Sequence, residues 1–491
     1  MLTSVALIAG FPLAGTLAAA CGARARGAGY AAIAGAVATL ALVVSLMVHV
    51  LGRGPVSAVS GFVYVDALGT FFLLTVALVV LVASLGSAAY LRAEEHAGVL
   101  SALQVRLYFV FFGLFASLML ASLETGNLGL LFVLIEGSTL ASVVLVGLEA
   151  KARSLEAAWK YVIISSLGVT IALVGTLYLF YSGSALQLTS NLRLAWPFLY
   201  AHAAELSHPN LRLAFLLAVV GYGTKVGLAP MHTWLPDAHA EAPSPASALL
   251  SAALLNTGMY AIIRFLAIAQ VGLGTAYVRH VMLAFGFLSI IIGVLFMVRR
   301  GNFKRLFAYS SVEHMGIIAV ALGFGGTLGL YGALLHTLNH AIGKSVLFLS
   351  SGDVVLAYHS RETRDVRGLL GALPLTGGVL LLATLAILGS PPFGLFLSEL
   401  TIVRAGFTLS NPVLPALLLL LLVVAFIGLA RSVTGMVTGP SPGRLQAYAT
   451  SSERVLAGLP LVAGLVGLLL LGVWVPDGLD HAIMSSIEAI S

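Results

Sequence analysis

Residues 221–250 read GYGTKVGLAPMHTWLPDAHAEAPSPASALL and place a lysine, Lys225, inside a strongly apolar stretch. A second apolar stretch, NLGLLFVLIEGSTLASVVLVGL at residues 127–148, contains Glu136. Holding a charge at the centre of a bilayer costs about 2.5 to 3.5 kcal/mol on insertion scales, so such residues are expected to be paired, hydrated and functional. The two stretches therefore predict a membrane protein that moves protons or cations.

The composition of the whole chain is that of an integral membrane protein. Of its 491 residues, 59% are hydrophobic and only 9% are charged, whereas about 25% of the residues in a soluble globular domain are charged. The formal net charge of +6 falls mostly in short loops, which indicates orientation in a bilayer and no nucleic-acid partner. The apolar start of the chain, from Leu2, is interpreted as a first membrane helix rather than a signal peptide.

The sequence offers no site for a redox cofactor. Cys21 is the only cysteine, which excludes disulfides within the chain, iron–sulfur clusters and cysteine-based zinc sites. The glycine-rich run GFGGTLGLYG, at residues 323–332, joins two apolar segments without a preceding strand, so it does not indicate a nucleotide-binding loop. We therefore expect no cofactor in this chain and no redox chemistry of its own.

Continuous apolar stretches, each long enough to cross about 30 Å of hydrocarbon as a helix, recur along the chain. They predict an all-α polytopic membrane protein with about fourteen transmembrane helices, because a β-barrel would show short alternating segments instead. The predicted spans are 2–20, 29–51, 67–90, 106–122, 127–148, 160–182, 211–229, 246–269, 280–298, 304–323, 328–356, 372–408, 412–436 and 456–475.

Basic residues are concentrated in alternate loops. The loops rich in them hold Arg24, Arg26, Arg92, Arg106, Lys151, Arg153, Lys160, Arg299, Arg300, Lys304, Arg305, Arg361, Arg364, Arg367, Arg444 and Arg454. The opposite loops hold mainly Arg53, Arg193 and Arg279. Because positive charge stays on the cytoplasmic side, this bias predicts that the rich loops are cytoplasmic and that both termini lie outside.

Two predicted spans contain helix-breaking residues. GLAP follows Lys225 in the seventh span, and GSPPFG at residues 389–394 interrupts the twelfth. Irregular backbone in a bilayer is tolerated only where protein or a water-filled cavity satisfies it, and paired interruptions favour inverted repeats around a central site. The two spans are five helices apart, and an odd offset reverses direction as an inverted repeat requires. Two unrelated proline kinks are the alternative interpretation.

Glu136 and Lys225 are the first candidates for a proton path. A carboxylate and an ammonium close together favour each other's charged form, while burial favours the neutral form of both. Movement of one would therefore change the protonation of the other, which is the minimum that a proton relay needs. The alternative is a static ion pair that fixes two helices.

The run LLHTLNHAIGKSVLFLSSGD, at residues 334–353, adds a polar stripe. His336, His340 and Lys344 follow each other at i, i+4 spacing, so they share one face of a helix. Histidine suits a proton path because its pKa lies near neutrality. The histidines could instead bind a metal, although further ligands would be needed and none is evident in the sequence, or they could serve packing alone.

Acidic and histidine residues near the two breaks complete the candidates. Glu399 follows the second break by one to two turns and is expected to carry protons in or out of the second half, unless it is a helix-terminus charge near Arg404. A cluster between the seventh and eighth spans is expected to form a polar vestibule; it contains His232, Asp237, His239 and Glu241. Secondary candidates, each with a packing or interfacial role as the alternative, are Glu124, Glu313 and His314.

The run KVGLAPMHTWLPDAHAEAPSPASALLSAALLNTGMYAIIRF, at residues 225–265, closely resembles the signature of the antiporter-like proton-channel subunits. These subunits occur in respiratory complex I, multisubunit cation/proton antiporters and membrane-bound NiFe hydrogenases. AYSSVEHMG (308–316) and GSPPFGLFLSE (389–399) are most similar to the hydrogenase-4 component F branch. The resemblance extends over nearly the whole chain.

The resemblance implies two inverted five-helix repeats with broken helices 7 and 12. It divides the chain into a three-helix segment (1–105), a first repeat (106–269), a second repeat (280–436) and a C-terminal helix (437–491). By position it makes Glu136 the fifth-helix glutamate, Lys225 the seventh-helix lysine, Lys344 the central lysine and Glu399 the twelfth-helix residue, with His336 and His340 in the central hydrated axis.

The implied function is proton translocation in a redox-driven complex of a prokaryotic inner (cytoplasmic) membrane. Lys225 would pass a proton through water, His336 and His340 to Lys344, and Glu399 would deliver it to the far side. Asn256 stands where some relatives carry a lysine, so this link would need water or His336. The implied partners are other membrane subunits and a peripheral iron–sulfur and NiFe-hydrogenase-like or complex I-like redox arm. The alternatives are a subunit of a multisubunit Na⁺/H⁺ antiporter, a complex I subunit and a passive membrane scaffold.

Overall fold

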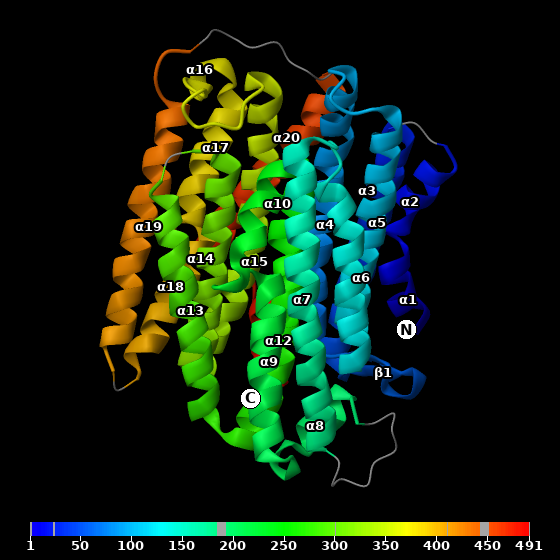
Figure 1. Cartoon of the computed structure of the whole chain (residues 1–491), viewed down its shortest axis with the longest axis vertical. Coiled ribbons are helices and arrows are strands. Elements are labelled where there is room, and N and C mark those ends of the chain that lie inside the picture. The colour runs from blue at the N-terminus through cyan, green and yellow to red at the C-terminus, as the bar shows by residue number, and fades with distance from the viewer. Residues whose placement is uncertain are drawn as a thin grey trace.

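The computed structural model describes residues 2–22, 25–183, 193–299, 301–409, 411–441 and 451–490. Within them, long helices run side by side from one end of the molecule to the other (Figure 1). Eleven helices are long and apolar enough to cross a membrane, or up to thirteen if each of two bent helix pairs is one span. The predicted all-α polytopic architecture is therefore confirmed. Arg24, Arg300 and Arg444, which contributed to the predicted orientation, lie outside the described residues, as does the side chain of Arg454.

The first part of the chain contains a short β-hairpin that the sequence did not predict. Two three-residue strands pair antiparallel, with Val56 opposite Val65. Strands this short between long apolar spans leave no periodic signal in a sequence. In chain order the elements are α1 (Leu2–Gly10), α2 (Leu13–Ala20), α3 (Ala25–Arg53), β1 (Val56–Ala58), η1 (Val59–Gly61), β2 (Val63–Val65) and α4 (Ala67–His96).

The middle of the chain supplies the two groups of helices that the sequence suggested as repeats. The first group contains α5 (Ala102–Glu124), α6 (Leu128–Val146), α7 (Ala152–Ser182), α8 (Trp196–Ala201), η2 (Ala203–Glu205), α9 (His208–Val226), η3 (Met231–Trp234), α10 (Leu235–Glu241), α11 (Ser244–Leu249), the π-turn η4 (Leu250–Leu254) and α12 (Leu255–Leu273). The second group contains α13 (Thr275–Met297), α14 (Phe303–Phe324), α15 (Gly326–Tyr358), α16 (Leu369–Ala372), α17 (Pro374–Ile387), α18 (Gly394–Phe407) and α19 (Val413–Val437).

The chain closes with a bent pair that the sequence suggested only in part. α20 (Ser451–Val473) corresponds to the last predicted span, and α21 (Asp477–Glu488) follows it at an angle of 74°. Both termini lie in the lower half of Figure 1, away from the end where α16 lies.

The two predicted breaks have the same backbone geometry. At the first, Gly227 takes a left-handed φ of 81°, and the N–H of Leu228 donates to the carbonyl of Gly223 at 2.8 Å. At the second, Gly389 has a φ of 62°, and the N–H of Ser390 donates to the carbonyl of Leu385 at 3.1 Å. Both are Schellman-type helix ends, which need glycine because a side chain is disfavoured at positive φ.

The two broken helices also enter the bundle from opposite ends. α9 begins beside α8, at the bottom of Figure 1, whereas α17 begins beside α16, at the top. α17 and α18 are 14 residues each, too short to cross about 30 Å of hydrocarbon alone. Together they flank the second break.

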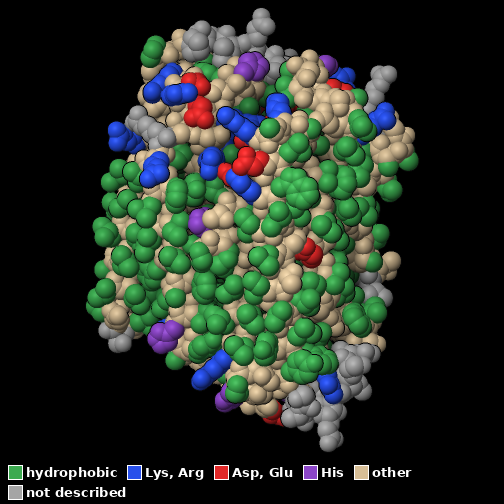
Figure 2. Space-filling view, viewed as in Figure 1, with side chains coloured by type: hydrophobic (Ala, Val, Ile, Leu, Met, Phe, Trp, Pro, Cys, Tyr) green, Lys and Arg blue, Asp and Glu red, His purple; other side chains and the backbone are tan. Residues whose placement is uncertain are grey.

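The face seen in Figure 2 is apolar across its middle, and a line of polar side chains is buried within an otherwise hydrophobic interior. Hydrophobic side chains cover the middle of the face in Figure 2, while most Lys and Arg side chains gather toward its upper end. The apolar window of α11–α12 is 100% buried and that of α14 is 94% buried. The buried residues include a lysine or histidine on each of α9, α10, α14 and α15, so the functional groups lie along the axis of the bundle.

Candidate functional site

Lys225 lies in the last turn of α9, directly before the first break, and is fully buried. Its Nζ donates hydrogen bonds to the hydroxyls of Thr139 (2.6 Å), Tyr161 (2.9 Å) and Ser165 (3.4 Å). The same Nζ lies 4.9 Å from the centre of the Tyr161 ring. Three neutral hydroxyls from α6 and α7 thus surround the ammonium, which suits a group that must lose and regain a proton.

Glu136 does not contact Lys225 directly. It is half-buried on α6, where its carboxylate accepts hydrogen bonds from Ser166 Oγ (2.5 Å) and Thr139 Oγ1 (3.3 Å). Thr139 therefore joins the two charged groups, because its hydroxyl accepts from Lys225 and donates to Glu136. The expected contact between carboxylate and ammonium is replaced by a bridge through one hydroxyl, and neither Thr139 nor Ser166 had been singled out in the sequence.

Lys344 lies at the second polar centre, where α15 packs against α14. Its Nζ donates to the carbonyl of Phe307 at 2.9 Å and to Ser310 Oγ. His340 and His336 follow on the same face of α15, and all three side chains are fully buried. The i, i+4 stripe therefore faces the protein interior along its whole length.

His314 on α14 joins this stripe. Its Nδ1 lies 2.9 Å from Nε2 of His336, and Nδ1 of His336 lies 3.0 Å from Ser398 Oγ on α18. Glu313, the neighbouring residue, places Oε2 3.6 Å from Nε2 of His314. The pair that the sequence suggested as secondary candidates thus lies at the centre of the buried cluster, where three helices meet.

Glu399 closes the cluster on the side of the second break. It is buried, and a Cβ at Gly389 would overlap its carboxylate, so the break leaves room for the acid. Ligand atoms of His314, His336 and Glu399 lie within 4.8 Å of one another. A metal ion that bound here would take these three residues from three helices, rather than the i, i+4 pair of His336 and His340.

His239 lies between the two lysine centres. It is fully buried on α10, within electrostatic range of Lys344, and its ring packs 5.5 Å from Phe348 and 6.2 Å from Trp234. Trp234 in turn packs 4.6 Å from Tyr161, which binds Lys225. The His239 imidazole therefore lies between the surroundings of Lys225 and those of Lys344.

The other three residues of this cluster make different contacts, and Glu241 pairs with Arg361 at 2.5 Å. Asp237 pairs with Lys160 (3.2 Å) and Arg305 (3.0 Å) and is partly exposed. His232 is buried with its ring 6.4 Å from that of Tyr309. The predicted vestibule is therefore divided. His239 lies in the protein interior, whereas Asp237 lies in a network of ion pairs at the end of the bundle where most Lys and Arg side chains gather.

Several polar groups along the axis have no hydrogen-bond partner among the described residues. They include both ring nitrogens of His340, both amide atoms of Asn339 and Oδ1 of Asn256, whose Nδ2 donates to Ala252 O at 2.7 Å. Buried polar groups without a protein partner are usually hydrated. These atoms mark where water would continue the path.

A strong buried ion pair was missed in the sequence. Arg264 on α12 donates to both carboxylate oxygens of Asp66, at 2.7 and 2.6 Å, and to the Tyr260 hydroxyl at 2.9 Å. Its guanidinium lies 4.0 Å from the Trp196 ring centre. Arg264 could have been noticed as an intramembrane charge in MYAIIRF, but its partner, 198 residues away, could not. Glu124 is buried at the end of α5 with Oε1 unpartnered among the described residues.

Two broken helices around a buried line of lysines, histidines and carboxylates define the class of multi-pass antiporter-like membrane subunits. The family described as "NADH:quinone oxidoreductase/Mrp antiporter, TM" matches residues 125–428, and the chain belongs to it. The matched region contains every candidate of the proton path except Glu124.

Curated relatives fall in the same family. The chain is 39% identical over 365 residues to the hydrogenase-4 component F homolog of Methylacidiphilum infernorum, covering 74% of this chain and 76% of the relative. It is 33% identical over 359 residues to hydrogenase-4 component B of Escherichia coli, covering 70% and 51%. The resemblance read from the sequence is therefore confirmed.

Solved structures share the fold. A chain of the membrane-bound sulfane sulfur reductase, an archaeal respiratory membrane complex, matches with a TM-score of 0.84 at 24% identity, covering 98% of this chain and 97% of that one. A chain of the Mrp complex from Dietzia matches with a TM-score of 0.82 at 20% identity, covering 100% and 97%. A chain of respiratory complex I from Thermus thermophilus gives 0.74 at 24% identity, covering 96% of each. All three neighbours are subunits of multisubunit membrane complexes.

Proposed function

We propose that this chain is the proton-translocating subunit of a redox-driven membrane complex of the hydrogenase-4 type. The observation that carries the proposal is the series of buried proton-binding groups Lys225, His239, Lys344 and Glu399, inside a bundle with many exposed hydrophobic side chains. Charged groups at this depth are costly and mark proton paths in membrane proteins. The similarity to a hydrogenase-4 component F homolog supports this type of complex.

The geometry favours a definite order of proton transfer. A charge change in a neighbouring subunit acts first on half-buried Glu136, and Thr139 transmits the change to Lys225. Lys225 releases its proton through water and His239 toward Lys344. The cluster of His314 and His336 adjoins Glu399, so we place these histidines after Lys344 rather than before it. His340 lies between Lys344 and His336 on α15 and carries the proton from Lys344 to His336.

The topology that suits this function has fourteen spans in two inverted repeats. It requires α17 and α18 to count as one interrupted span. Their entry from the end opposite to α9, and the shared geometry of the two breaks, support this arrangement. The basic end would then face the cytoplasm of a prokaryote and the termini the outside.

Copurification of the native complex from membranes tests the identity of the complex. Hydrogenase-like large and small subunits together with iron–sulfur proteins would support the proposal. Recovery of small antiporter subunits alone would replace it with a cation/proton antiporter, and recovery of the chain without partners would contradict a multisubunit role. The proton path is tested separately by Lys225→Ala and Glu399→Gln, which must each abolish proton pumping by the assembled complex.

A further inference from the structure

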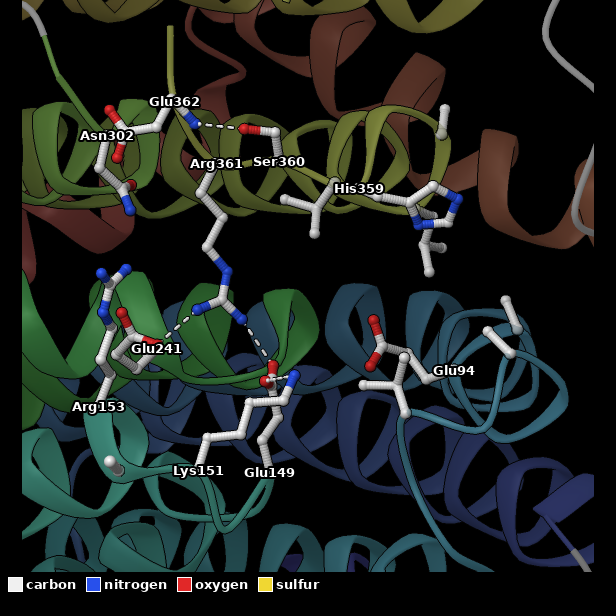
Figure 3. Close-up of a pocket in the computed structure, with 17 residues that line it drawn as sticks. Glu94, Glu149, Lys151, Arg153, Glu241, Asn302, His359, Ser360, Arg361 and Glu362 are labelled. Carbon is white, nitrogen blue, oxygen red and sulfur yellow. Dashed lines mark hydrogen bonds and ion pairs between the residues drawn. The ribbon is translucent and has the colours of Figure 1, made fainter. Parts of the chain in front are cut away.

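A cavity of about 900 Å³ opens at the basic end of the bundle, outside the path described above. It lies between the ends of α4, α7, α10 and α15 and the loop that follows α15 (Figure 3). Four carboxylates line it, namely Glu94, Glu149, Glu241 and Glu362. A charged, open cavity of this size next to buried proton-binding groups is a candidate site for proton entry.

Arg361 crosses the cavity and holds two of its carboxylates. Its guanidinium donates to Glu241 at 2.5 Å and to Glu149 at 2.6 Å, as Figure 3 shows, and Lys151 adds a bond of 2.8 Å to Glu149. Burial alone would raise the pKa of the Glu149 carboxyl, but Arg361 and Lys151 outweigh it and lower the pKa. The clamp therefore favours the ionised form of Glu149.

A buried lysine lies directly behind the clamp. Lys304, in the first turn of α14, is 1% exposed and donates to the carbonyl of Ala242 at 2.6 Å, next to Glu241 in the chain. It lies within electrostatic range of Arg361, Glu149 and Glu241. Such a charge is costly to bury unless it is used or paired, and the proposed path makes no use of it.

Lys304 is joined to the central lysine by two elements. Along α14, Lys304 precedes Phe307 by three residues, and the carbonyl of Phe307 accepts a hydrogen bond from Lys344 at 2.9 Å. Residues three apart lie on one face of a helix. On the facing helix, His239 lies within electrostatic range of both Lys304 and Lys344. Lys304 and His239 are therefore two buried proton-binding groups between the cavity and Lys344, and water would have to join them.

We propose that this cavity is a proton-uptake vestibule that loads Lys344 through Glu241, Lys304 and His239, with Arg361 as its gate. The proposal rests on the proposed function, since it supplies protons to that path. While the clamp is closed, Glu241 is bound to Arg361 and accepts no proton. When Arg361 moves away, Glu241 takes one proton from solvent. Lys304 gives its own proton to His239, becomes neutral, and is then reprotonated by Glu241, which returns to the carboxylate.

The gate is attached to the helices that carry the path. The Arg361 carbonyl accepts a hydrogen bond of 2.9 Å from Phe303, the first residue of α14, and Thr363 donates to Gly301 at 2.9 Å. Arg361 also follows the end of α15 by three residues. A shift of α14 or α15 that accompanies protonation of Lys344 would therefore move Arg361 as well.

Substitutions in the assembled complex give the first test. Glu241→Gln and Lys304→Met should each slow proton pumping at least about tenfold, and Arg361→Gln should lower the number of protons pumped per electron pair. Arg364→Gln is the matched control, because Arg364 belongs to the same loop but not to the cavity. Normal pumping by Glu241→Gln and Lys304→Met would overturn the proposal.

Chemical modification gives a second test that does not depend on losing a side chain. Ala97 is exposed and lines the cavity, so Ala97→Cys in a Cys21→Ser background places one thiol there. A cationic methanethiosulfonate added from the basic end should slow pumping several-fold, and an anionic reagent of similar size should not. Equal effects of the two reagents, full labelling without effect, or no labelling would each contradict the vestibule.

The outcomes separate this inference from the proposed function. If Lys225→Ala and Glu399→Gln stop pumping while Glu241→Gln and Lys304→Met do not, only the vestibule is wrong. If all four variants pump normally, both proposals fail. If Glu241→Gln and Arg361→Gln prevent recovery of the assembled complex while Arg364→Gln does not, the cavity is a subunit interface and the uptake role is rejected.

Discussion

The hydroxyl of Thr139 accepts a 2.6 Å hydrogen bond from Lys225 and lies 3.3 Å from the carboxylate of Glu136. One threonine thus stands between the two charges that first marked this chain as a proton carrier. Glu136 and Lys225 therefore act on each other through a rotatable hydroxyl and not through a direct ion pair.

Thr139→Val should uncouple Glu136 from Lys225. Loss of the hydroxyl leaves the buried ammonium with one partner fewer, at a cost of about 1 to 3 kcal/mol, and we expect pumping to fall about tenfold or more while Thr139→Ser retains it. Proton uptake by membrane vesicles that carry the complex measures the effect. Thr75→Val is the control, because Thr75 is equally buried but bonds only within its own helix. Equal pumping by Thr139→Val and Thr75→Val would disprove the bridge.

Ser398→Ala should impair delivery to Glu399 without affecting the first half of the path. Ser398 lies 3.0 Å from Nδ1 of His336 and helps to fix which ring nitrogen carries the proton. We expect pumping to fall roughly three- to tenfold, in line with one lost hydrogen bond, with assembly unchanged. Ser345→Ala, which removes a buried serine that bonds only to Ala341 of its own helix, should pump normally. A normal rate for Ser398→Ala would show that this contact is only structural.

Gly389→Ala should damage the second break. The residue has a φ of 62°, and an added methyl group would meet the Glu399 carboxylate, so the change strains the backbone by about 1 to 2 kcal/mol and displaces the acid. Both the thermal stability of the purified complex and its pumping should fall. Gly378→Ala on α17 meets nothing within 4 Å and serves as the comparison. If the two variants behave alike, Glu399 does not depend on the geometry of the break.

Arg264→Leu should be among the most destabilising single substitutions in this chain. It leaves the buried Asp66 carboxylate without its cation, which typically costs about 3 to 5 kcal/mol. Thermal unfolding in detergent would measure the loss, and adding Asp66→Ala should restore part of it because the unpaired charge is then gone. No recovery in the double variant would mean that Arg264 acts mainly through its contacts with Trp196 and Tyr260.

The Glu149–Arg361 contact should make stability depend on pH in the acid range. Because the pKa of Glu149 is lowered in the folded protein from 4.5, its contribution is fully present above that value and is lost as pH falls through the lower folded pKa. The groups facing it are Arg361, Lys151 and Lys304, with Glu94 as a like charge nearby. The melting temperature of Glu149→Gln should therefore be below that of the native chain at pH 7, and the gap should narrow in acid. If the difference in melting temperature stays constant at pH values well below 4.5, the ion pair does not contribute to stability.

Much of the fold could be predicted because bilayer-spanning helices have a length and a composition that a sequence shows directly. Both helix breaks could be predicted from the run around Lys225 and the run GSPPFG, because proline and glycine act on the local backbone. The β1–β2 hairpin and α21 escaped prediction because they lie outside the apolar spans.

Contacts between helices could not be predicted in the same way. Periodicity placed His336, His340 and Lys344 on one face, but it did not say that His314 would meet that face. The serine and threonine hydroxyls that bind Lys225 carry no sequence signal, because such residues are common in membrane helices. Arg264 and Asp66 are 198 residues apart, and only the packing of α4 against α12 brings them together.

The central claim is that protons cross the membrane along the buried line that ends at Glu399. Its most direct test is the number of protons pumped per electron pair by vesicles carrying the assembled complex with Glu399→Gln, compared with Glu399→Asp. The account predicts that the glutamine variant keeps redox turnover but pumps at least about tenfold less, while the aspartate variant retains pumping. Unchanged pumping by the glutamine variant, with the complex intact, would contradict the account.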